Sequence, residues 1–491
     1  MKRALLLSVF SMLLLPFACL AHVGSPDIFY EGNAGPYRLF VTVRTPAMIP
    51  GIAEIEVRSL DEKVTGIDIA LSRIVGEGSK NAPPPDHMDR MSGDPSYFTG
   101  RLWLMESGAY QVRMEVLGER GKAEMAVPIA AAARTTLPMQ KALGVLLVGL
   151  MTVLMLALVS IFGAAVRESQ VEPGVAPSQA QVGRGRVTMA ATAVVILVIL
   201  FLGNWWWNAE AAARKDLMLY KQPPIEAALS DGNTLVLKMG LSQWHDRRKD
   251  MLLDKIIPDH GHLMHVFLVR MPEMDRFYHL HPDRTAQGTF AEKLPAVSKG
   301  DYQIFADVVR ESGFADTMTA RITLPEVTDQ ALSGDDSSAS ATPIASVEQK
   351  TTAALEDGGS AEWVPGVQPI RAQTAMLLRF RVLDHAGKPA TDLEPYMGMA
   401  GHLVIVKKDL SVFAHVHPSG SAPMAAIMLL QKNAANAVDA MNDMPGMQEA
   451  ALPPEVTFPY GFPRPGQYRL FVQVKRSGRI ETAIFDTTVA P

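Results

Sequence analysis

Apolar residues along this chain follow two patterns: three dense runs, and many short segments in which apolar and polar positions alternate. Two of the dense runs, 143–165 and 187–207, each carry roughly 20 apolar residues without a charge, enough to cross a bilayer as a helix. We therefore predict transmembrane helices at 139–166 and 187–207, with the lipid bilayer as a partner. The Gly, Pro, Ser and Gln residues between them predict a flexible loop at 167–186. The alternative is a buried helix pair in a soluble domain.

The third dense run begins the chain. It follows a short basic start, MKR, and ends in small residues, as a secretory signal peptide does. We predict a signal peptide at 1–21 and a mature chain that starts at His22. In the alternative, Cys19 is a lipidated anchor.

Export of the N-terminus sets the membrane orientation. Both large segments, 22–138 and 208–491, are then predicted to lie in the periplasm or another extracytoplasmic space, beside the cytoplasmic (inner) membrane. The loop at 167–186 is predicted to be cytoplasmic, and it carries arginines, as cytoplasmic loops often do.

The alternating segments predict short β-strands. AEIEVRS, TLVLKMG and LLRFRVLD are examples from the first, middle and last parts of the exported chain. Short strands with turn residues between them are typical of antiparallel sandwiches. We predict a mainly β fold of immunoglobulin-like antiparallel β-sandwich modules at 22–138, 208–325 and 363–491, plus the two transmembrane helices. The run SGDDSSASATPIAS predicts a linker at 326–362.

An internal repeat relates the modules. A glycine turn followed by a strand that opens with tyrosine occurs at Tyr110, Tyr302 and Tyr468. A tyrosine at such a corner buries its ring and bonds to the backbone through its hydroxyl, so we predict a structural role for these residues. The last two modules share a longer order, GHL…HxHP…GxY, that starts at Gly261 and Gly401. We interpret them as copies of one sandwich.

Composition and charge narrow the function classes. The net charge is −5 and charged residues make up 20% of the chain, which favours neither nucleic acid nor a strongly acidic partner. The single cysteine, Cys19, lies in the predicted signal peptide. An exported chain without further cysteine has no disulfides, so any metal site must use histidine, methionine or carboxylate.

Histidines carry the main candidate chemistry. The phrases FYHLHP and FAHVHP each place two histidines two positions apart, and residues i and i+2 of a strand face the same way. If the GHL strand pairs alongside, its histidine joins them at about 5 Å. The candidate metal ligands are His262, His279 and His281 in the middle module, and His402, His415 and His417 in the last. His260 and His265 lie nearby in the sequence. The alternative is that these histidines bond to backbone or carboxylate groups.

Methionines bear on the identity of the metal. Met397 and Met399 precede the GHL of the last module, and a long insert after its HxHP holds Met441, Met444 and Met447. Thioether sulfur is soft and selects Cu(I), whereas imidazole accepts Cu(II) and zinc. We predict copper as the cofactor, with zinc as the alternative. The methionines could instead fill irregular parts of the core.

The first module offers a different copper site. A mature chain that starts at His22 presents an α-amino group and an imidazole, which can chelate one copper ion, and His87 is the other histidine of this module. The alternative is that His22 is an accident of cleavage and His87 an ordinary loop residue.

The last module resembles a known family. PYMGMAGHLVIVKKDLSVFAHVHPSG, followed by FPRPGQYRLFVQVKRSGR, is similar to the YtkA-like domain family, best over 365–491 and less over 220–325. FixH-like accessory proteins are similar in their membrane-tethered sandwich, and the His22 start is similar to CopC-type periplasmic copper carriers. The resemblance implies an immunoglobulin-like β-sandwich, export, and an association with metal or copper-protein assembly. On this chain it reaches His402, His415 and His417 and, in the copy, His262, His279 and His281.

These patterns favour a membrane-anchored copper-binding or copper-delivery protein whose partners are copper proteins or an envelope complex. A metal-independent envelope scaffold is the alternative, and a redox enzyme with a copper ion at His22 is a third. The sequence shows no Ser-His-Asp arrangement, phosphate loop, HExxH motif or nucleotide fingerprint, so an enzyme is not predicted.

Overall fold

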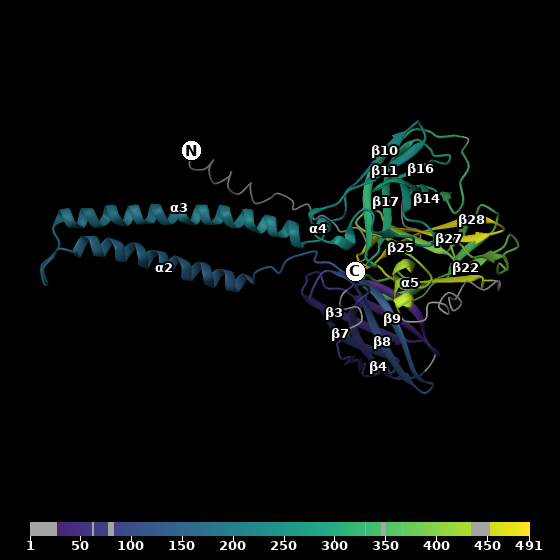
Figure 1. Cartoon of the computed structure of the whole chain (residues 1–491), viewed down its shortest axis with the longest axis horizontal. Helices are drawn as coiled ribbons and strands as arrows, with labels where there is room; N and C mark the ends of the chain where they lie inside the picture. Colours follow the sequence, from purple (N-terminus) through teal and green to yellow (C-terminus); the bar gives the residue numbers. More distant parts are fainter. Residues whose placement is uncertain are drawn as a thin grey trace. The chain divides into compact units, whose positions relative to one another are not determined.

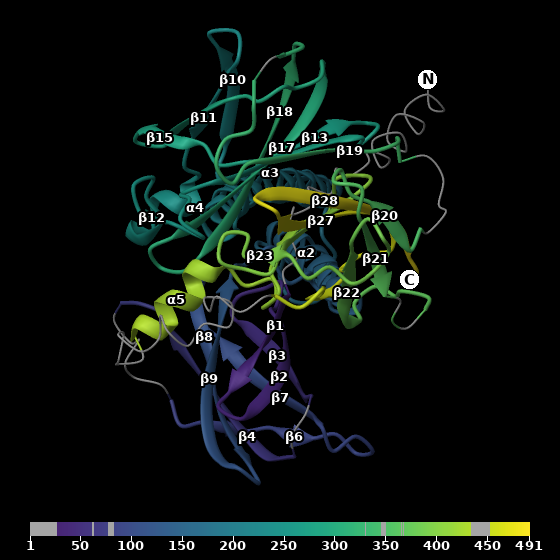
Figure 2. The same ribbon diagram turned by 90° about the vertical axis from the view of Figure 1, so that its right-hand side faces the viewer.

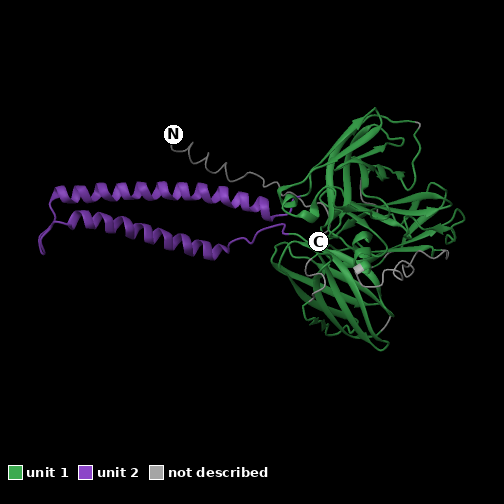
Figure 3. Ribbon diagram, in the orientation of Figure 1, with its two compact units in different colours: residues 1–132, 222–491 green, residues 133–221 purple. Residues whose placement is uncertain are grey.

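The computed structural model describes residues 27–60, 63–76, 83–328, 330–344, 350–364, 366, 368–433 and 452–491. The chain divides into two compact units, one formed by 1–132 with 222–491 and the other by 133–221 (Figure 3). Strands account for 46% of the structure and helices for 20%. The predicted mainly β fold with two long apolar helices is therefore confirmed.

The smaller unit contains two long helices, α2 (Lys141–Glu168) and α3 (Gln179–Met218) (Figure 1). Both have the length and hydropathy of membrane spans, and their most apolar windows contain no buried residue. They indicate association with a lipid bilayer. Helix α3 begins before the predicted 187 because Ser178 and Gln181 form a capping box at its N-terminus. The connection between the helices is therefore shorter than the predicted loop at 167–186.

The larger unit contains three β-sandwich modules. The strands of module 1 (28–131) are β1 (Ile28–Ala34), β2 (Tyr37–Arg44), β3 (Gly51–Ser59), β4 (Val64–Arg73), β5 (Asp86–His87), β6 (Asp89–Arg90), β7 (Tyr97–Leu104), β8 (Gly108–Gly118) and β9 (Gly121–Ala131). They form one sheet in the order β1-β2-β3-β7-β6 and another in the order β5-β4-β8-β9. The alternate apolar residues of both sheets fill one core between them.

Module 2 (225–340) begins after the end of α3. Its strands are β10 (Ile225–Ser230), β11 (Thr234–Met239), β12 (Ile256–Ile257), β13 (His265–Met271), β14 (Arg276–Leu280), β15 (Asp283–Ala286), β16 (Thr289–Lys293), β17 (Gly300–Arg310), β18 (Ala315–Leu324) and β19 (Ser337–Ser340). The sheets run β10-β11-β16-β15 and β12-β17-β13-β14-β19, and β18 also pairs with β17. A short helix, α4 (Gln243–Asp246), and a 3₁₀ turn, η1 (Lys249–Met251), follow β11.

Module 3 (352–489) repeats this plan. Its strands are β20 (Thr352–Ala354), β21 (Ser360–Val364), β22 (Ala375–Leu383), β23 (Leu393–Glu394), β24 (His402–Lys407), β25 (Phe413–Val416), β26 (Glu455–Gly461), β27 (Gly466–Arg476) and β28 (Arg479–Val489). The sheets run β20-β21-β22-β26 and β23-β27-β24-β25, and β28 also pairs with β27. Helix α5 (Met424–Asn433) lies in the sequence insert that follows β25.

The segment 326–362 is not a linker over its whole length, contrary to the prediction. Strand β19 pairs with β14, with Ser337 opposite His279, and β20 and β21 belong to module 3. A polar Ser, Asp and Gly composition predicts a loop. An edge strand is nevertheless held by main-chain hydrogen bonds, which leave little trace in the side-chain pattern.

Tyr302 and Tyr468 have the predicted structural role. Both rings are buried, and each hydroxyl donates to a main-chain oxygen four residues earlier, Ser298 O at 2.7 Å and Arg464 O at 2.6 Å. The same bond therefore closes the corner before β17 and before β27. This equivalence supports the interpretation of modules 2 and 3 as copies of one sandwich.

Modules 2 and 3 pack against each other through the second faces of two sheets. In β13, Leu268 points into the core of module 2, whereas its neighbour Phe267 lies in a separate apolar cluster shared with module 3. In β24, Ile405 belongs to the core of module 3 and Val404 to the shared cluster. Both faces of these sheets are covered, which explains why the strands read as continuous apolar runs rather than as a strict alternation.

The contacts across this interface are reciprocal. Phe277 of β14 stacks on Phe471 of β27 with ring centroids 4.1 Å apart, and Phe413 of β25 stacks on Phe305 of β17 at 4.2 Å. Phe277 and Phe413 hold the same place before HxH, and Phe305 and Phe471 hold the same place after GxY. The two modules are therefore related by an approximate two-fold axis, like the halves of an isologous dimer.

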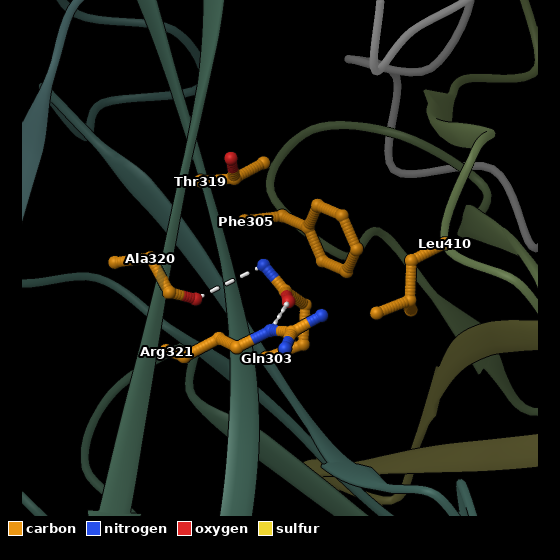
Figure 4. Close-up of a pocket in the computed structure, with 6 residues that line it drawn as sticks. All are labelled: Gln303, Phe305, Thr319, Ala320, Arg321 and Leu410. Carbon is orange, nitrogen blue, oxygen red and sulfur yellow. Dashed lines mark hydrogen bonds between the residues drawn. The ribbon is translucent and has the colours of Figure 1, made fainter. Parts of the chain in front are cut away.

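The reciprocity fails where a pocket of about 280 Å³ opens between β17, β18 and Leu410 (Figure 4). On the opposite side of the interface, the buried Arg469 donates from Nη1 to Met274 O at 2.7 Å. The residue equivalent to Arg469 is Gln303, whose side chain accepts a hydrogen bond from Arg321 instead. Gln303 is shorter than arginine and leaves the pocket beside Leu410.

The segment after β25 joins all three modules. Ser419 O accepts a hydrogen bond from Glu31 N of β1 at 2.8 Å, and α5 lies against β9 of module 1 (Figure 2). At the N-terminus of α5, Ala425 N donates to Asp259 Oδ1 of module 2 at 2.6 Å. This segment follows directly on the second HxHP phrase, so the histidines of module 3 are connected to both neighbours.

Replacing Phe471 by alanine should destabilise the interface between modules 2 and 3 by about 3–5 kcal/mol, because it removes a fully buried ring together with its stack on Phe277. Thermal unfolding of the full-length chain in detergent measures the effect. Trp103→Ala is the matched control, since Trp103 is 62% exposed and its loss should change the midpoint little. Equal effects of the two substitutions would contradict a tightly packed interface.

Candidate metal centre

Eight of the chain's 12 histidines gather between modules 2 and 3, beside the phenylalanine stacks. Neighbouring rings in this group lie between 4.1 and 6.4 Å apart, measured between centroids. We call the group the histidine centre, and its members are His260, His262, His265, His279, His281, His402, His415 and His417.

Strand alternation places most of these rings. His279 lies in β14 and His281 follows the strand, and their ring centroids are 4.5 Å apart. His415 in β25 and His417 just after it have the same arrangement, with centroids 4.6 Å apart. His402 opens β24, which pairs with β25, and its ring lies 5.1 Å from that of His417. The three candidate histidines of module 3 therefore lie close together on the face that meets module 2.

The middle module departs from the sequence alignment. The shared GHL letters match His262 with His402, but the structure matches His265, which opens β13 as His402 opens β24. His262 lies in the turn before β13, where its ring stacks on His281 at 4.1 Å and its Nε2 is 3.5 Å from Asp335 Oδ2. The sequence alignment matched the wrong histidine because His262 and His265 lie three positions apart and only His262 belongs to a GHL sequence.

The turn before each of these strands is also shared. Residues 259–262 and 396–399 are each closed by paired main-chain hydrogen bonds, and His260 and Met397 both adopt positive φ, 51° and 50°. The two turns touch, because His260 Nδ1 donates to Met397 O at 2.9 Å. His260 thereby joins the histidines of the other module.

In the part of the chain that the structure describes, two groups of three histidines have the spacing of a metal site, with one ligand atom from each residue within 4.8 Å of the others. The intramodule triad, drawn from module 2 alone, is His265, His279 and His281. The bridging triad, drawn from both modules, is His260, His402 and His417. His415 lies between the triads, with its ring 5.4 Å from His265 and 4.6 Å from His417.

In the intramodule triad, two outer ring nitrogens face groups that only accept hydrogen bonds. His265 Nε2 lies 3.0 Å from Asp259 O, and His281 Nδ1 lies 2.9 Å from Asp336 Oδ1. The carboxylate of Asp336 also accepts from the main-chain N of His281 at 3.0 Å. The N–H of His265 is therefore on Nε2, and that of His281 is on Nδ1.

The third outer nitrogen, Nδ1 of His279, is held by module 3. It lies 3.0 Å from Gln473 Oε1, and this amide is oriented because its Nε2 donates to Ser337 Oγ. The Tyr396 hydroxyl is 3.3 Å from the same Nδ1 and donates its own hydrogen to Asp335 O at 2.8 Å, so it can only accept from His279. The N–H of His279 is therefore on Nδ1.

The inner nitrogens of this triad then face one another without a hydrogen atom between them. His265 Nδ1 and His279 Nε2 are 3.1 Å apart, and His281 Nε2 is buried without a partner among the described residues. A neutral imidazole carries one N–H, and each ring has already used it on the outer side. Buried lone pairs that converge in this way repel unless a cation lies between them. The arrangement suits a three-histidine metal site whose outer hydrogen bonds are in place.

The bridging triad has fewer outer contacts. The bond from His260 Nδ1 to Met397 O leaves His260 Nε2 buried without a partner in the described part of the chain. Within the same part, neither ring nitrogen of His402 has a hydrogen-bond partner. His415 Nδ1 lies 3.6 Å from Asp307 Oδ2. Each buried nitrogen left without a partner costs about 1–3 kcal/mol, a cost that packing alone does not explain.

Burial sets the charge state of the histidine centre. The pKa values of His265, His279, His402 and His417 lie well below the usual 6.5, first because burial disfavours the charged ring and then because neighbouring histidines repel a proton. Burial also lowers the pKa of His281. These rings are neutral at pH 7 and offer lone pairs rather than positive charge.

Met397 and Met399 are the candidate methionines that the structure describes. Met397 contributes its main-chain oxygen, whereas the Met399 side chain is buried in an apolar cluster with Ala422, Met424 and Ile427. Packing therefore accounts for Met399 without a role as a ligand. The remaining candidates, Met441, Met444 and Met447, lie outside the described residues.

His87, the candidate ligand of module 1 that the structure describes, is separate from the histidine centre. His87 is exposed on β5, and its Nδ1 lies 2.6 Å from Asp68 Oδ1 on β4. His22, its predicted partner, lies outside the described residues. His87 therefore has a hydrogen-bond partner of its own and belongs to neither triad.

Several residues of the centre were missed or undervalued in the sequence. His260 and His265 were noted only as neighbours, and Asp336 lies in the segment predicted to be a linker. Gln473 and Asp307 hold the same place in β27 and β17, five residues after the corner tyrosine. A polar residue at this place in both apolar strands was a signal that could have found them.

A Ser–His–Asp chain, which no sequence pattern indicated, lies elsewhere in module 2. Ser242 Oγ is 2.7 Å from His245 Nδ1, and His245 Nε2 is 3.3 Å from Asp316 Oδ1. His245 and Asp316 are fully buried, and Asp316 also accepts from Arg310 Nε at 2.9 Å. The chain fastens α4 to β18, and we assign it a structural role.

Comparison with known proteins finds one family model over part of this chain and solved structures of low sequence identity. A family model described as a domain of unknown function (DUF8832) matches residues 354–491. No curated protein matches the chain. Among solved structures, an engineered protein is 15% identical over 19% of this chain and 20% of its own length, with a TM-score of 0.15.

Two longer structural matches are similarly distant. A tetra-tandem repeat from the extending region of a large adhesion protein is 8% identical over 91% of this chain and 72% of its own, with a TM-score of 0.17. The D1–D4 ectodomain fragment of ICAM-5 is 7% identical over 92% and 76%, with a TM-score of 0.15. Likeness at these scores carries no argument about fold or function.

The metal-free chain should lose stability as the pH falls below about 6.5. The histidines of the unfolded chain bind protons from that pH downwards, whereas burial keeps the rings of the folded chain neutral. Protonation therefore stabilises the unfolded state relative to the folded state. Denaturant unfolding in the presence of a chelator, at several pH values between 8 and 5, measures the slope. The double variant His402→Asn and His417→Asn should have a shallower slope, and an unchanged slope would contradict the assigned charge states.

Proposed function

We propose that this chain is a membrane-anchored protein that binds or delivers transition-metal ions at the histidine centre, with copper as the first choice and zinc as the alternative. The proposal combines two features: helices α2 and α3 have the properties of membrane spans, and neutral imidazoles converge in the larger unit. The protein's task would be to hold an ion and pass it on by ligand exchange rather than to transform a substrate.

One observation carries the proposal. The three rings of the intramodule triad point their N–H groups outward to acceptors, so that three bare nitrogens meet in a buried place. A set of histidines kept for packing or hydrogen bonding would place a donor opposite each acceptor. Neutral imidazoles that meet lone pair to lone pair favour a cation as the missing partner.

The donor set limits the choice of ion. Imidazole nitrogen suits copper and zinc, whereas carboxylate and carbonyl oxygens would suit magnesium or calcium. Copper is favoured because the predicted mature chain lacks cysteine and its sequence carries Met441, Met444 and Met447 in the insert between β25 and β26. A chelate at His22, with His87 as a further ligand, remains a separate prediction for the first module.

The location belongs to the proposal. A signal peptide at 1–21 would carry 22–138 and 208–491 to the periplasmic or extracytoplasmic side of the cytoplasmic membrane. Ions held there could be handed to copper proteins or to an envelope complex. The resemblance of 365–491 to the YtkA-like domain family points the same way.

A metal-independent envelope scaffold is the alternative. Sandwich modules joined through reciprocal contacts suit that role, and the phenylalanine stacks alone would hold modules 2 and 3 together. A scaffold gains nothing from buried nitrogens without partners, since apolar side chains of the same volume would fill the interface more stably. The histidine centre therefore favours the metal-binding function.

Purified full-length chain that is exposed to Cu(I) or to Zn(II) and then desalted should retain metal, measured by inductively coupled plasma mass spectrometry. A variant that removes two ligands from each triad should lose the metal of the histidine centre. It carries His265→Asn, His279→Asn, His402→Asn and His417→Asn.

The matched control for this experiment is His385→Asn, which removes an exposed histidine outside the centre. It should bind as the unaltered chain does at the histidine centre. If the unaltered chain retains no metal, or if the four-residue variant retains as much as the unaltered chain, the scaffold function is favoured instead.

In the metal-free chain, His402→Leu should keep or raise the free energy of unfolding, by up to about 3 kcal/mol, because it removes two buried nitrogens that lack partners. His279→Leu should lower it by about 1–3 kcal/mol, because it leaves the buried Gln473 Oε1 without the N–H that it accepts. Denaturant unfolding with a chelator present compares the two. A residue whose replacement raises stability is retained for function rather than for folding. If both substitutions lowered the free energy of unfolding equally, His402 would not support the metal-binding function.

A further inference from the structure

We propose that the histidine centre holds two ions in sites of unequal strength. The intramodule triad keeps one ion firmly. The bridging triad holds a second, exchangeable ion that links modules 2 and 3. This inference rests on the proposed metal-binding function and deepens it, because it assigns the storage of an ion and the transfer of an ion to different residues.

The number of ions follows from the number of ligands. The triads share no residue, and ligand atoms come within 4.8 Å of one another inside each triad. Copper and zinc bound by imidazole take about four ligands in a compact shell, with bonds of about 2.0–2.1 Å to nitrogen for zinc. Six histidines in two separate sets, with His415 as a seventh, exceed what one ion can use.

The difference in strength follows from the outer hydrogen bonds. Every ring of the intramodule triad has its outer N–H held by an acceptor, including Asp336 and Gln473. In the bridging triad His260 has such an acceptor, Met397 O, whereas His402 has none among the described residues. Outer acceptors fix the orientation of a ligand ring, and their loss weakens metal binding about 10–100-fold.

The two triads also differ in where their ligands come from. The intramodule triad is carried by β13, β14 and the residue that follows β14, so its ligands share one sheet. The bridging triad joins the turn before β13 to β24 and the end of β25, so its ligands belong to two modules. An ion in the bridging triad is therefore lost or gained as the modules shift, and it holds them together while bound.

His415 gives the two triads a connection. Its ring lies 5.4 Å from His265 and 5.4 Å from His402, and its Nε2 is buried without a partner among the described residues. Because its Nε2 has no partner there, His415 can bind an ion leaving one triad before the other triad takes it. Ligand exchange can then move an ion through the interface without releasing it to water.

The test is a titration of the full-length chain with Cu(I) under anaerobic conditions against a chromophoric chelator, repeated with Zn(II). We expect two ions per chain at the histidine centre, with affinities that differ about 10–100-fold. After desalting against the chelator, one ion should remain. His281→Asn should abolish the firmly held ion and leave a weak one, and His260→Asn should abolish the exchangeable ion and leave a firm one.

Two further variants keep the test decisive if a ligand variant fails to fold. Asp336→Asn removes no ligand but loosens the outer bond of His281, so it should weaken the firmly held ion alone. His385→Asn is the matched control, because His385 is exposed in the turn after β22 and lies outside the histidine centre, and it should leave both ions in place.

The outcomes separate this inference from the proposed function. No metal in the unaltered chain would overturn the proposed function itself. Metal binding with one ion at the histidine centre, with two ions of equal strength, or with both ions lost together in His260→Asn and in His281→Asn, would leave the proposed function intact and overturn the two-site inference.

Discussion

The packing of two sheets through their second faces is the constraint on which the rest of the larger unit depends. A sheet in a sandwich normally keeps one face in water, but the sheets that carry β13 and β24 are covered on both sides. The stacks of Phe277 on Phe471 and of Phe305 on Phe413 close this interface. Because water is excluded beside these stacks, the histidines that continue the same strands are buried and neutral.

Duplication explains the site and also its asymmetry. The order β12-β17-β13-β14 in module 2 matches β23-β27-β24-β25 in module 3, and both modules have the corner tyrosine, so each copy brings its own HxH pair to the shared face. The copies then differ at matched places. His260 stands where module 3 has Met397, and Asp307 stands where module 3 has Gln473. Gln473 gives His279 of the intramodule triad its outer acceptor, and Asp307 faces His415 instead. In the bridging triad His260 is held by Met397 O, whereas His402 has no partner among the described residues.

The surroundings of the histidine centre suit a protein that holds and passes ions. The segment that follows the second HxHP contacts module 1 through Ser419 and module 2 through Ala425. Ligands of the bridging triad thus lie where three modules meet, and small changes in their packing would alter that triad first. Helices α2 and α3 would keep such a protein close to the bilayer.

The sequence by itself determined the elements that depend on local pattern. Alternating positions predicted the strands, the dense runs predicted α2 and α3, and the glycine before each tyrosine predicted the corner bonds of Tyr302 and Tyr468, since all of these follow from residues close together in the chain. The i and i+2 spacing also brought His279 beside His281 and His415 beside His417 for the same reason.

Only the tertiary structure decided which histidines form a set. The shared GHL sequence matched His262 with His402, whereas the register of β13 places His265 at the equivalent position of the strand. Register depends on the pairing of β13 with β14 and β17 rather than on sequence identity. The reach of His260 into the other module, and the arrival of Asp336 and Gln473 as acceptors, depend on contacts between segments far apart in the chain. Such contacts arise from the docking of whole sheets, and no local pattern of residues records how two sheets dock.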